Sequence, residues 1–403
     1  MRGGKDRPSE IREDLSLLER RNMLVVLGAM VALAIGILHP GYAGDAKLPK
    51  EISWSTYESG SSAYAQSIGI GALLKKKYGT ELGIVPASGE IGRQTPLKTG
   101  QSQLCACGIG AYFAQEGVLM FATKAWGPQR VLNLFNNIGT NGQQLAVSET
   151  SGIRKPEDLK GKRVTFVRGS PTLNQNTEAM LAFAGLTWND VQKIEVSGWG
   201  KSIQAVINGE ADAAWGNTAA SYYVKLINSP QGLFLPPLPH SDEAGWKRAL
   251  ERAPWWSKSM IKTVAPGYRH AVPYEGNNYP YPIIVAAADT PNDLAYGLTR
   301  AVMENYADLK DDAPGMDGYR LAVQNLKWVL PYHAGAIRYF KEKGLWKAEH
   351  DVHNAELVKR QNVLAEAWNE MQAKSVPDDK FAEEWLKLRA AALTKANLPV
   401  IFQ

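Results

Sequence analysis

The chain has 403 residues, enough for two or three domains, and its 45% hydrophobic and 21% charged content is ordinary for a globular protein. Its formal net charge of +5 is small and evenly spread, which argues against a nucleic-acid-binding surface. The two cysteines, Cys105 and Cys107, are not part of any Cys/His cluster with metal-ligand spacing. We therefore expect no metal or cofactor. Because a disulfide between residues two apart is usually strained, we expect both cysteines to be buried thiols.

Residues 1–43 have the layout of an export signal. A polar segment ends at Arg20-Arg21, and a 16-residue apolar stretch from Met23 to Leu38 follows. Adjacent arginines before a mildly apolar stretch are typical of the twin-arginine export route. The alternative is an uncleaved membrane anchor, for which this stretch is short. We therefore predict a periplasmic protein whose signal is cleaved near Gly44.

The exported part begins with a strand, a hydroxyl-rich loop and a helix. Residues 51–57 alternate like a strand, residues 58–62 form the loop, and a helix follows to about Lys77. Free N–H groups and the dipole at a helix N-terminus favour a negatively charged group, so this loop is a candidate binding site. Tyr57 could equally be a core residue, and Arg93 could be a surface residue of the next helix. The candidate ligand-binding residues of this part are Tyr57, Ser59, Gly60, Ser61, Tyr64, Ser88 and Arg93.

The same order of elements recurs at residues 158–186. Residues 163–167 are rich in β-branched and aromatic side chains and read as a buried strand. A loop over residues 169–172 and a helix from about Leu173 to Ala184 follow. The simpler interpretation is an ordinary strand-to-helix turn with a Ser or Thr cap. The candidate ligand-binding residues of this part are Ser170, Thr172 and Asn174, with Trp215 and Asn217 from a later strand.

These two units predict two similar α/β lobes. The segment 97–106 resembles 206–215, since each reads as a helix end, a Gly turn and a strand of small residues. Ligands of open α/β sheets bind beyond the carboxyl ends of the strands. Residues 145–148 fit a strand that crosses between the lobes, and residues 279–288 fit a returning strand. We expect lobe one to comprise residues 44–147 and about 280–350, lobe two residues 148–279, and a helical C-terminal extension residues 351–403.

Several motifs in this order resemble the TAXI-type solute-binding subunits of tripartite ATP-independent periplasmic (TRAP) transporters. The matching segments are Ser151-Gly152-Ile153, Asp158 to Val164, Gly169 to Thr172, Gly209 to Ala214 and His333 to Gly344. The resemblance extends roughly from Ile52 to Leu345. It implies a type II periplasmic-binding fold with two lobes and a hinge. It also implies a small carboxylate-like solute and the membrane permease subunits of a TRAP transporter as partners.

The sequence departs from the family pattern at three places. Gly60-Ser61 stands where a Gly-Gly pair is usual, Pro171 lies inside the Gly-Ser loop, and Ala334 replaces a common proline. The first two fall on the expected cleft, so they bear on the identity of the solute more than on the fold.

An enzyme would need a recognisable catalytic constellation. The sequence has no Gly-x-Ser-x-Gly elbow, no His-Glu-x-x-His motif and no Walker loop, and His333 fits a structural role at a helix start. A ligand sensor that docks to a signalling receptor would share the fold, so only the partner distinguishes it from a transport protein. We predict a non-enzymatic protein that captures an organic acid or acidic amino acid by lobe closure and delivers it to a TRAP permease.

Overall fold

The computed structural model describes residues 47–402. The predicted export signal falls on residues 1–43, outside the described residues. Among residues 47–402, no helix combines the length and hydropathy needed to cross a bilayer.

The first sheet has the strand order β2-β1-β3-β11-β4. Its strands are β1 (Glu51–Tyr57), β2 (Glu81–Ala87), β3 (Leu104–Cys107), β4 (Val131–Asn136) and β11 (Ile283–Ala287). Strands β1, β2 and β3 are parallel, whereas β11 runs antiparallel to both β3 and β4. The predicted returning strand is therefore an internal strand of this sheet.

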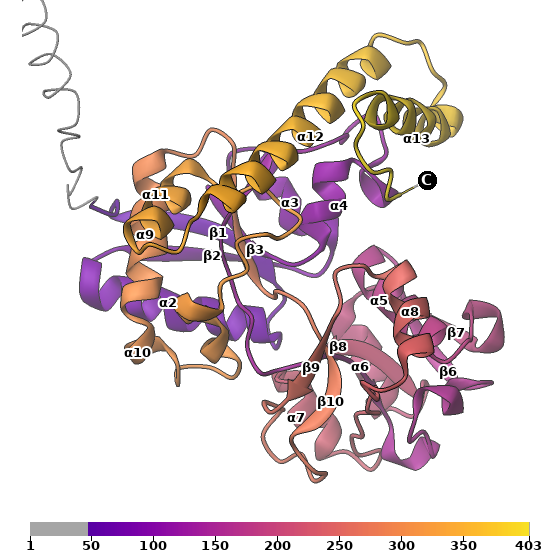
Figure 1. Cartoon of the computed structure of the whole chain (residues 1–403). Helices are drawn as coiled ribbons and strands as arrows, with labels where there is room; N and C mark the ends of the chain where they lie inside the picture. Colours follow the sequence, from indigo (N-terminus) through magenta and orange to yellow (C-terminus); the bar gives the residue numbers. More distant parts are fainter. Residues whose placement is uncertain (1–46, 403) are drawn as a thin grey trace, which may run out of the picture. The chain divides into compact units, whose positions relative to one another are not determined.

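Helices pack against the first sheet and complete lobe one (Figure 1). They are α2 (Ser62–Tyr78), α3 (Glu90–Lys98), α4 (Gly110–Glu116), α9 (Asn292–Glu304), α10 (Tyr306–Leu309) and α11 (Ala334–Glu342). Trp54 of β1, Leu74 of α2 and Leu298 of α9 are fully buried in one apolar cluster. Helix α2 begins where predicted, because the Ser61 hydroxyl accepts from the Tyr64 N–H at 3.1 Å and caps it.

The second sheet has the order β5-β8-β6-β7, with β5 antiparallel to β8. Its strands are β5 (Gln143–Val147), β6 (Arg163–Val167), β7 (Gln192–Val196) and β8 (Ala213–Asn217). The helices of this lobe are α5 (Pro171–Phe183), α6 (Trp199–Ile207), α7 (Ser221–Ile227) and α8 (Glu243–Arg252). A separate hairpin pairs β9 (Ser257–Ile261) with β10 (Tyr274–Asn278).

The chain crosses between the two sheets twice, and the crossings are hydrogen-bonded to each other. Asn137 N donates to Pro282 O at 2.9 Å, and Tyr281 N donates to Asn137 O at 2.8 Å. The first crossing is already complete at Gln143, since β5 lies in the second sheet, earlier than the lobe boundary we placed at residue 147. Two sheets joined by adjacent crossings form the expected two-lobed fold of the type II periplasmic-binding class.

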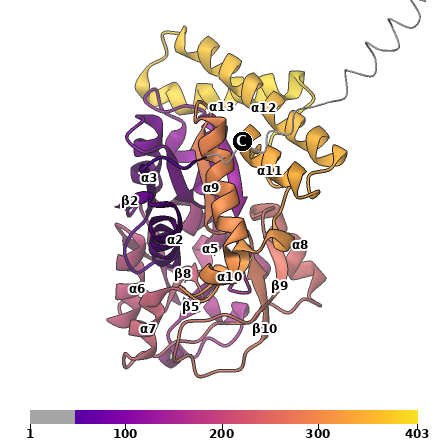
Figure 2. The same ribbon diagram turned by 90° about the vertical axis from the view of Figure 1, so that its left-hand side faces the viewer.

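Helices α12 (Ala348–Gln372) and α13 (Asp378–Lys395) follow lobe one and pack against each other, as Figure 2 shows. Asp378 opens the second of these helices. A buried ion-pair cluster attaches both helices to α4: Arg360 and Arg389 contact the carboxylate of Glu116, which is fully buried. Short 3-10 helices occupy Leu119–Phe121, Glu149–Ser151, Pro156–Leu159, Trp188–Asp190, Met316–Tyr319 and Leu321–Val323.

Our expectation of two free thiols was wrong. Cys105 and Cys107 form a disulfide within β3, with their Cα atoms 5.4 Å apart. That Cα separation lies in the usual range for disulfides, although the residues are only two apart in sequence. Side chains two apart on a strand point to the same face, so these sulfur atoms share one buried environment.

Candidate functional site

A pocket lies between the two lobes, at the carboxyl ends of β1 and β8. We call it the cleft pocket. Its volume is about 40 Å³, and one water needs about 10–15 Å³ measured this way, so an organic solute can enter only if the lobes separate. The residues that line it are Tyr57, Glu58, Ser61, Ser62, Ser88, Glu90, Arg93, Ile109, Gln143, Ser170, Thr172, Leu173, Trp199, Trp215, Gly216, Asn217, Ala220, Tyr279 and Tyr281.

The cleft pocket brings together most of the residues that the sequence suggested, from both lobes. Those that line it are Tyr57, Ser61, Ser88, Arg93, Ser170, Thr172, Trp215 and Asn217. Their positions follow from the fold, because most of them come at the end of a strand or near the start of the helix behind it, and Trp215 lies within β8.

The other four candidates lie outside the pocket lining. Ser59 is exposed, and Tyr64 lies in the first turn of α2. Asn174 bonds instead to β6: its side chain accepts from Val167 N at 2.8 Å and donates to Val167 O at 2.9 Å. Gly60 has a φ of 95°, and a Cβ there would lie 2.5 Å from the Tyr222 ring, so only glycine fits this contact between the lobes.

A buried ion pair lies at the lobe-one side of the pocket. Arg93 and Glu90 are each 2% exposed, and Arg93 Nη2 lies 2.7 Å from Glu90 Oε2. Burial opposes the charge of Arg93, but Glu90 outweighs it and raises the guanidinium pKa. The Arg93 guanidinium also lies over the Tyr57 ring, 3.8 Å from its centroid. Arg93 therefore stays protonated, and Glu90 offsets its charge.

Several buried polar groups face this pocket without a hydrogen-bond partner among the described residues. They include the hydroxyls of Ser62 and Thr172 and the side-chain N–H groups of Gln143 and Asn217. The Asn217 amide orientation is fixed, because its Oδ1 accepts from Ala219 N at 2.8 Å and leaves Nδ2 as a donor. Unpaired buried donors are costly unless a bound group accepts from them.

Hydrogen bonds connect the two lobes around the pocket. Ser170 Oγ donates to Glu90 Oε1 at 3.2 Å, and Glu90 N donates to Gly169 O at 3.3 Å. At the other side, Gly200 N in the first turn of α6 donates to Glu58 Oε1 at 2.9 Å. The structure therefore has the lobes in direct contact, and a carboxylate of lobe one already occupies the N-terminus of a lobe-two helix.

The sequence identified Tyr57 and Trp215, but it did not identify the other aromatic residues of the pocket, Trp199, Tyr279 and Tyr281, or its carboxylates as site residues. Tyr279 and Tyr281 belong to the second crossing, and burial raises the pKa of both hydroxyls, which stay neutral. The repeated Tyr-Pro pattern at residues 279–282 was the available signal. For Glu90, the signal was its place directly after the small-residue turn Ser88-Gly89.

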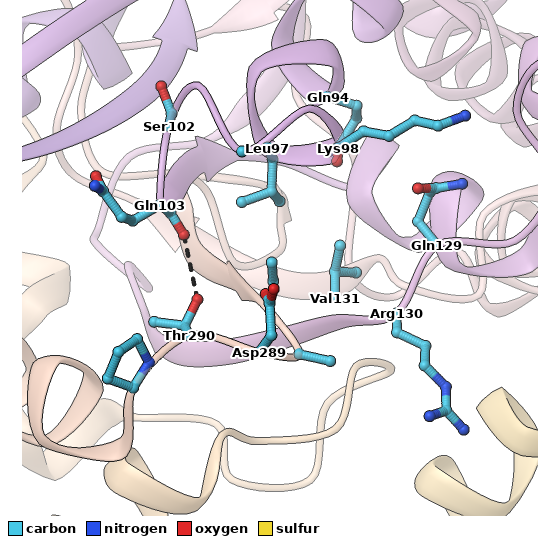
Figure 3. A pocket seen from close by; sticks show the side chains of 14 residues that line it. Gln94, Leu97, Lys98, Ser102, Gln103, Gln129, Arg130, Val131, Asp289 and Thr290 are labelled. Carbon is cyan, nitrogen blue, oxygen red and sulfur yellow. Dashed lines mark hydrogen bonds between the residues drawn. The ribbon is translucent and has the colours of Figure 1, made fainter.

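A larger pocket of about 470 Å³ lies at the other end of the strands of the first sheet, where β3 and β4 begin and β11 ends. Figure 3 shows Leu97, Val131 and Asp289 directed toward its interior, and Lys98 and Arg130 extending away. Thr290 Oγ1 donates to Gln103 O at 3.5 Å beside it. None of the predicted site residues lines this pocket, and lobe two contributes none of its lining. The cleft pocket is therefore the better candidate site.

The chain matches the NMT1-like family over residues 56–344. This range contains every residue that lines the cleft pocket, and all of both sheets except residues 51–55 of β1. It ends before α12 and α13. The match supports the coarser part of our expectation, a two-lobed solute-binding protein, and it leaves the TAXI subtype as a prediction.

Comparison with solved structures gives many similar chains at low sequence identity. The periplasmic aliphatic sulphonate binding protein SsuA from Escherichia coli has 16% identity and a TM-score of 0.40, over 87% of this chain and 89% of that one. The alkanesulfonate-binding protein SsuA from Xanthomonas axonopodis pv. citri has 16% identity and a TM-score of 0.40, over 74% and 95%. A Streptococcus mutans structure concerning glutathione import via GshT has 12% identity and a TM-score of 0.44, over 66% and 93%.

Proposed function

We propose that this chain, which belongs to the NMT1-like family, is an extracytoplasmic solute-binding protein that holds a small carboxylate-containing solute in its cleft pocket. The observation that carries the proposal is the set of buried polar groups that come from both lobes, belong to pocket-lining residues and have no hydrogen-bond partner among residues 47–402. A carboxylate offers several acceptor sites, so it can accept from donors on opposite walls at once. In this proposal the pocket binds and releases the solute without changing it chemically.

Charge and helix geometry support an anionic group at a particular place. Thr172 lies in the first turn of α5, where the helix dipole favours negative charge. Arg93 supplies a cation on the facing lobe, but Glu90 already pairs with it. The solute therefore competes with Glu90 for Arg93, and the hydroxyl and amide donors make the contacts that have no competitor within the described protein.

Capture requires the lobes to open and close. Opening breaks the bonds from Ser170 to Glu90 and from Gly200 to Glu58, and closing forms them again over the solute. The paired crossings at Asn137 and Tyr281 are the proposed hinge, because they are the two segments that connect the sheets.

Binding is tested by calorimetry with dicarboxylates, acidic amino acids and their amides. For a solute that binds, Asn217→Ala and Thr172→Val should each weaken affinity roughly ten- to a hundredfold, since one hydrogen bond to a charged group is worth about 1.5–3 kcal/mol. Ser59→Ala, in an exposed position outside the pocket, is the matched control. If the amide binds as well as the acid and both variants bind like the wild type, the pocket does not hold a carboxylate.

We propose a membrane permease of the TRAP type as the partner, on the basis of the family resemblance. The alternative partner is a signalling receptor that binds the closed conformation. Co-purification of the tagged full chain with permease subunits encoded beside it, in the presence of the bound solute, would support transport. Recovery of a receptor instead of a permease would favour the sensor.

Export is proposed from residues 1–43, which lie outside the described residues. Replacing Arg20 and Arg21 with lysine should leave precursor in the cytoplasm, because the twin-arginine route requires both residues. Sequencing of the periplasmic protein should give an N-terminus near Gly44. Normal periplasmic yield of the double variant would exclude this route.

A further inference from the structure

We infer that Phe402 is a positioning residue for the cleft pocket, and that it acts through the aromatic contact between lobe one and lobe two. Phe402 follows α13, beyond the part of the chain that matches the family. Its main chain is held in place, because Arg389 Nη1 donates to Phe402 O at 2.8 Å. Arg360 Nη1 likewise donates to Pro399 O at 2.7 Å. Figure 1 shows this end of the chain returning from α13 toward α4.

The Phe402 ring packs on α4, close to where the lobes meet. Its centroid lies 5.7 Å from that of Tyr112 and 5.4 Å from that of Phe113. Phe113 makes an edge contact of 5.7 Å with Trp255, which follows α8 in lobe two. Phe113 is fully buried and Trp255 is 6% exposed, so Phe113 is a buried link between Phe402 and Trp255.

Trp255 connects this contact to the pocket through Asn176 of α5. Trp255 Nε1 and Trp256 Nε1 donate to the same acceptor, Asn176 Oδ1, at 3.1 and 2.6 Å. Asn176 Nδ2 then donates to the Tyr279 hydroxyl at 2.9 Å and to Thr172 O at 2.8 Å. Tyr279 and Thr172 line the cleft pocket, so one buried amide connects both tryptophans to two walls of the site.

A second contact reaches the pocket from the same place. Trp256 stacks on Trp215 of β8 with a centroid distance of 5.3 Å and an interplanar angle of 17°. Trp215 lines the pocket. A shift of the Trp255-Trp256 pair would therefore displace the Tyr279 wall and the Trp215 wall together. The tail, which packs on lobe one, would thus set the position of groups in lobe two and in the second crossing.

The test is hydrogen–deuterium exchange of the full chain without solute, which does not depend on the proposed ligand. Phe402→Ala should speed exchange roughly two- to tenfold at residues 253–258, 274–281 and 172–178, the range expected for the loss of one aromatic contact. Ile401→Ala, at a neighbouring and exposed position, is the matched control and should leave these segments unchanged. Phe402→Tyr keeps the ring and should restore wild-type exchange.

A purely structural role would give a different pattern. Faster exchange confined to α4 and residues 378–402, with residues 253–258 and 274–281 unchanged, would overturn the inference. So would equal effects of Ile401→Ala and Phe402→Ala. If Phe402→Ala does not fold, Phe402→Leu is used in its place with the same criteria.

Discussion

Replacing Glu116 with glutamine should destabilise the protein strongly, although the residue lies away from the cleft pocket. Its carboxylate is fully buried and both oxygens are engaged: Oε1 accepts from Arg360 Nε at 2.7 Å, and Oε2 accepts from Arg360 Nη2 at 2.6 Å and contacts Arg389. Burial opposes ionisation of Glu116, but the two guanidiniums outweigh it and lower its pKa. Glutamine keeps the shape and leaves two buried cations without a counter-charge.

The expected size follows from this geometry. Breaking a buried ion pair by neutralising one partner costs about 3–5 kcal/mol. Unfolding entropy near the midpoint is about 2.1 cal/mol/K per residue, or about 0.75 kcal/mol/K for a folded part of this length. The midpoint should therefore fall by about 4–7 °C. Arg360 and Arg389 keep their bonds to Pro399 O and Phe402 O, which places the expected value at the lower end.

Scanning calorimetry at neutral pH measures this shift. Glu383→Gln removes an exposed i,i+4 partner of Lys387 in α13, and it should change the midpoint by less than about 1 °C. Replacing all three charged side chains, as Glu116→Leu with Arg360→Met and Arg389→Met, should recover much of the loss, since apolar residues avoid the desolvation cost. If Glu116→Gln has the same unfolding midpoint as the wild type, the cluster does not attach α12 and α13 to α4.

Two further outcomes follow from the structure. Burial lowers the pKa of His333, whose Nδ1 accepts from Gly335 N at the start of α11. A lowered folded pKa means that stability is present above about pH 6.5, the unfolded value, and is lost as pH falls through the folded one. His333→Asn, which keeps a capping acceptor, should therefore flatten the dependence of the unfolding free energy on pH below about pH 6.5. Urea titrations at several pH values measure this dependence, and an unchanged dependence would contradict the assignment. Gly60→Ala should hold the lobes apart, because the added Cβ meets the Tyr222 ring, and small-angle scattering should show a larger radius of gyration. The same radius as the wild type would mean that Tyr222 moves aside without cost.

The sequence predicted the fold and much of the pocket lining because both depend on local patterns. Ser170 and Thr172 were identifiable, since a strand, a hydroxyl loop and a helix start place such residues at a sheet edge in any α/β lobe. Asn174 follows the same pattern, but its amide bonds to Val167 instead of facing the pocket. Only the turn geometry decides between these two orientations of the side chain.

Other features depend on contacts between distant residues, which a single sequence does not contain. The bond from Ser170 to Glu90 joins residues 80 apart, and it exists only because the lobes meet. The position of β5 was also missed, since a short apolar strand fits either sheet until its partner is known. The disulfide between Cys105 and Cys107 could be predicted only from the local backbone geometry, which places the two Cα atoms 5.4 Å apart.

The antiparallel strand β11 has a consequence for how this chain folds. It lies between β3 and β4, and β4 pairs with it in the first sheet, yet it comes about 150 residues later in the sequence. During synthesis β4 therefore has no strand partner until residues 283–287 leave the ribosome, whereas β5 to β8 are contiguous and can pair earlier. Lobe two should thus form first. An unfinished lobe one with an open strand edge should be the species most prone to aggregate, and the natural substrate for chaperones.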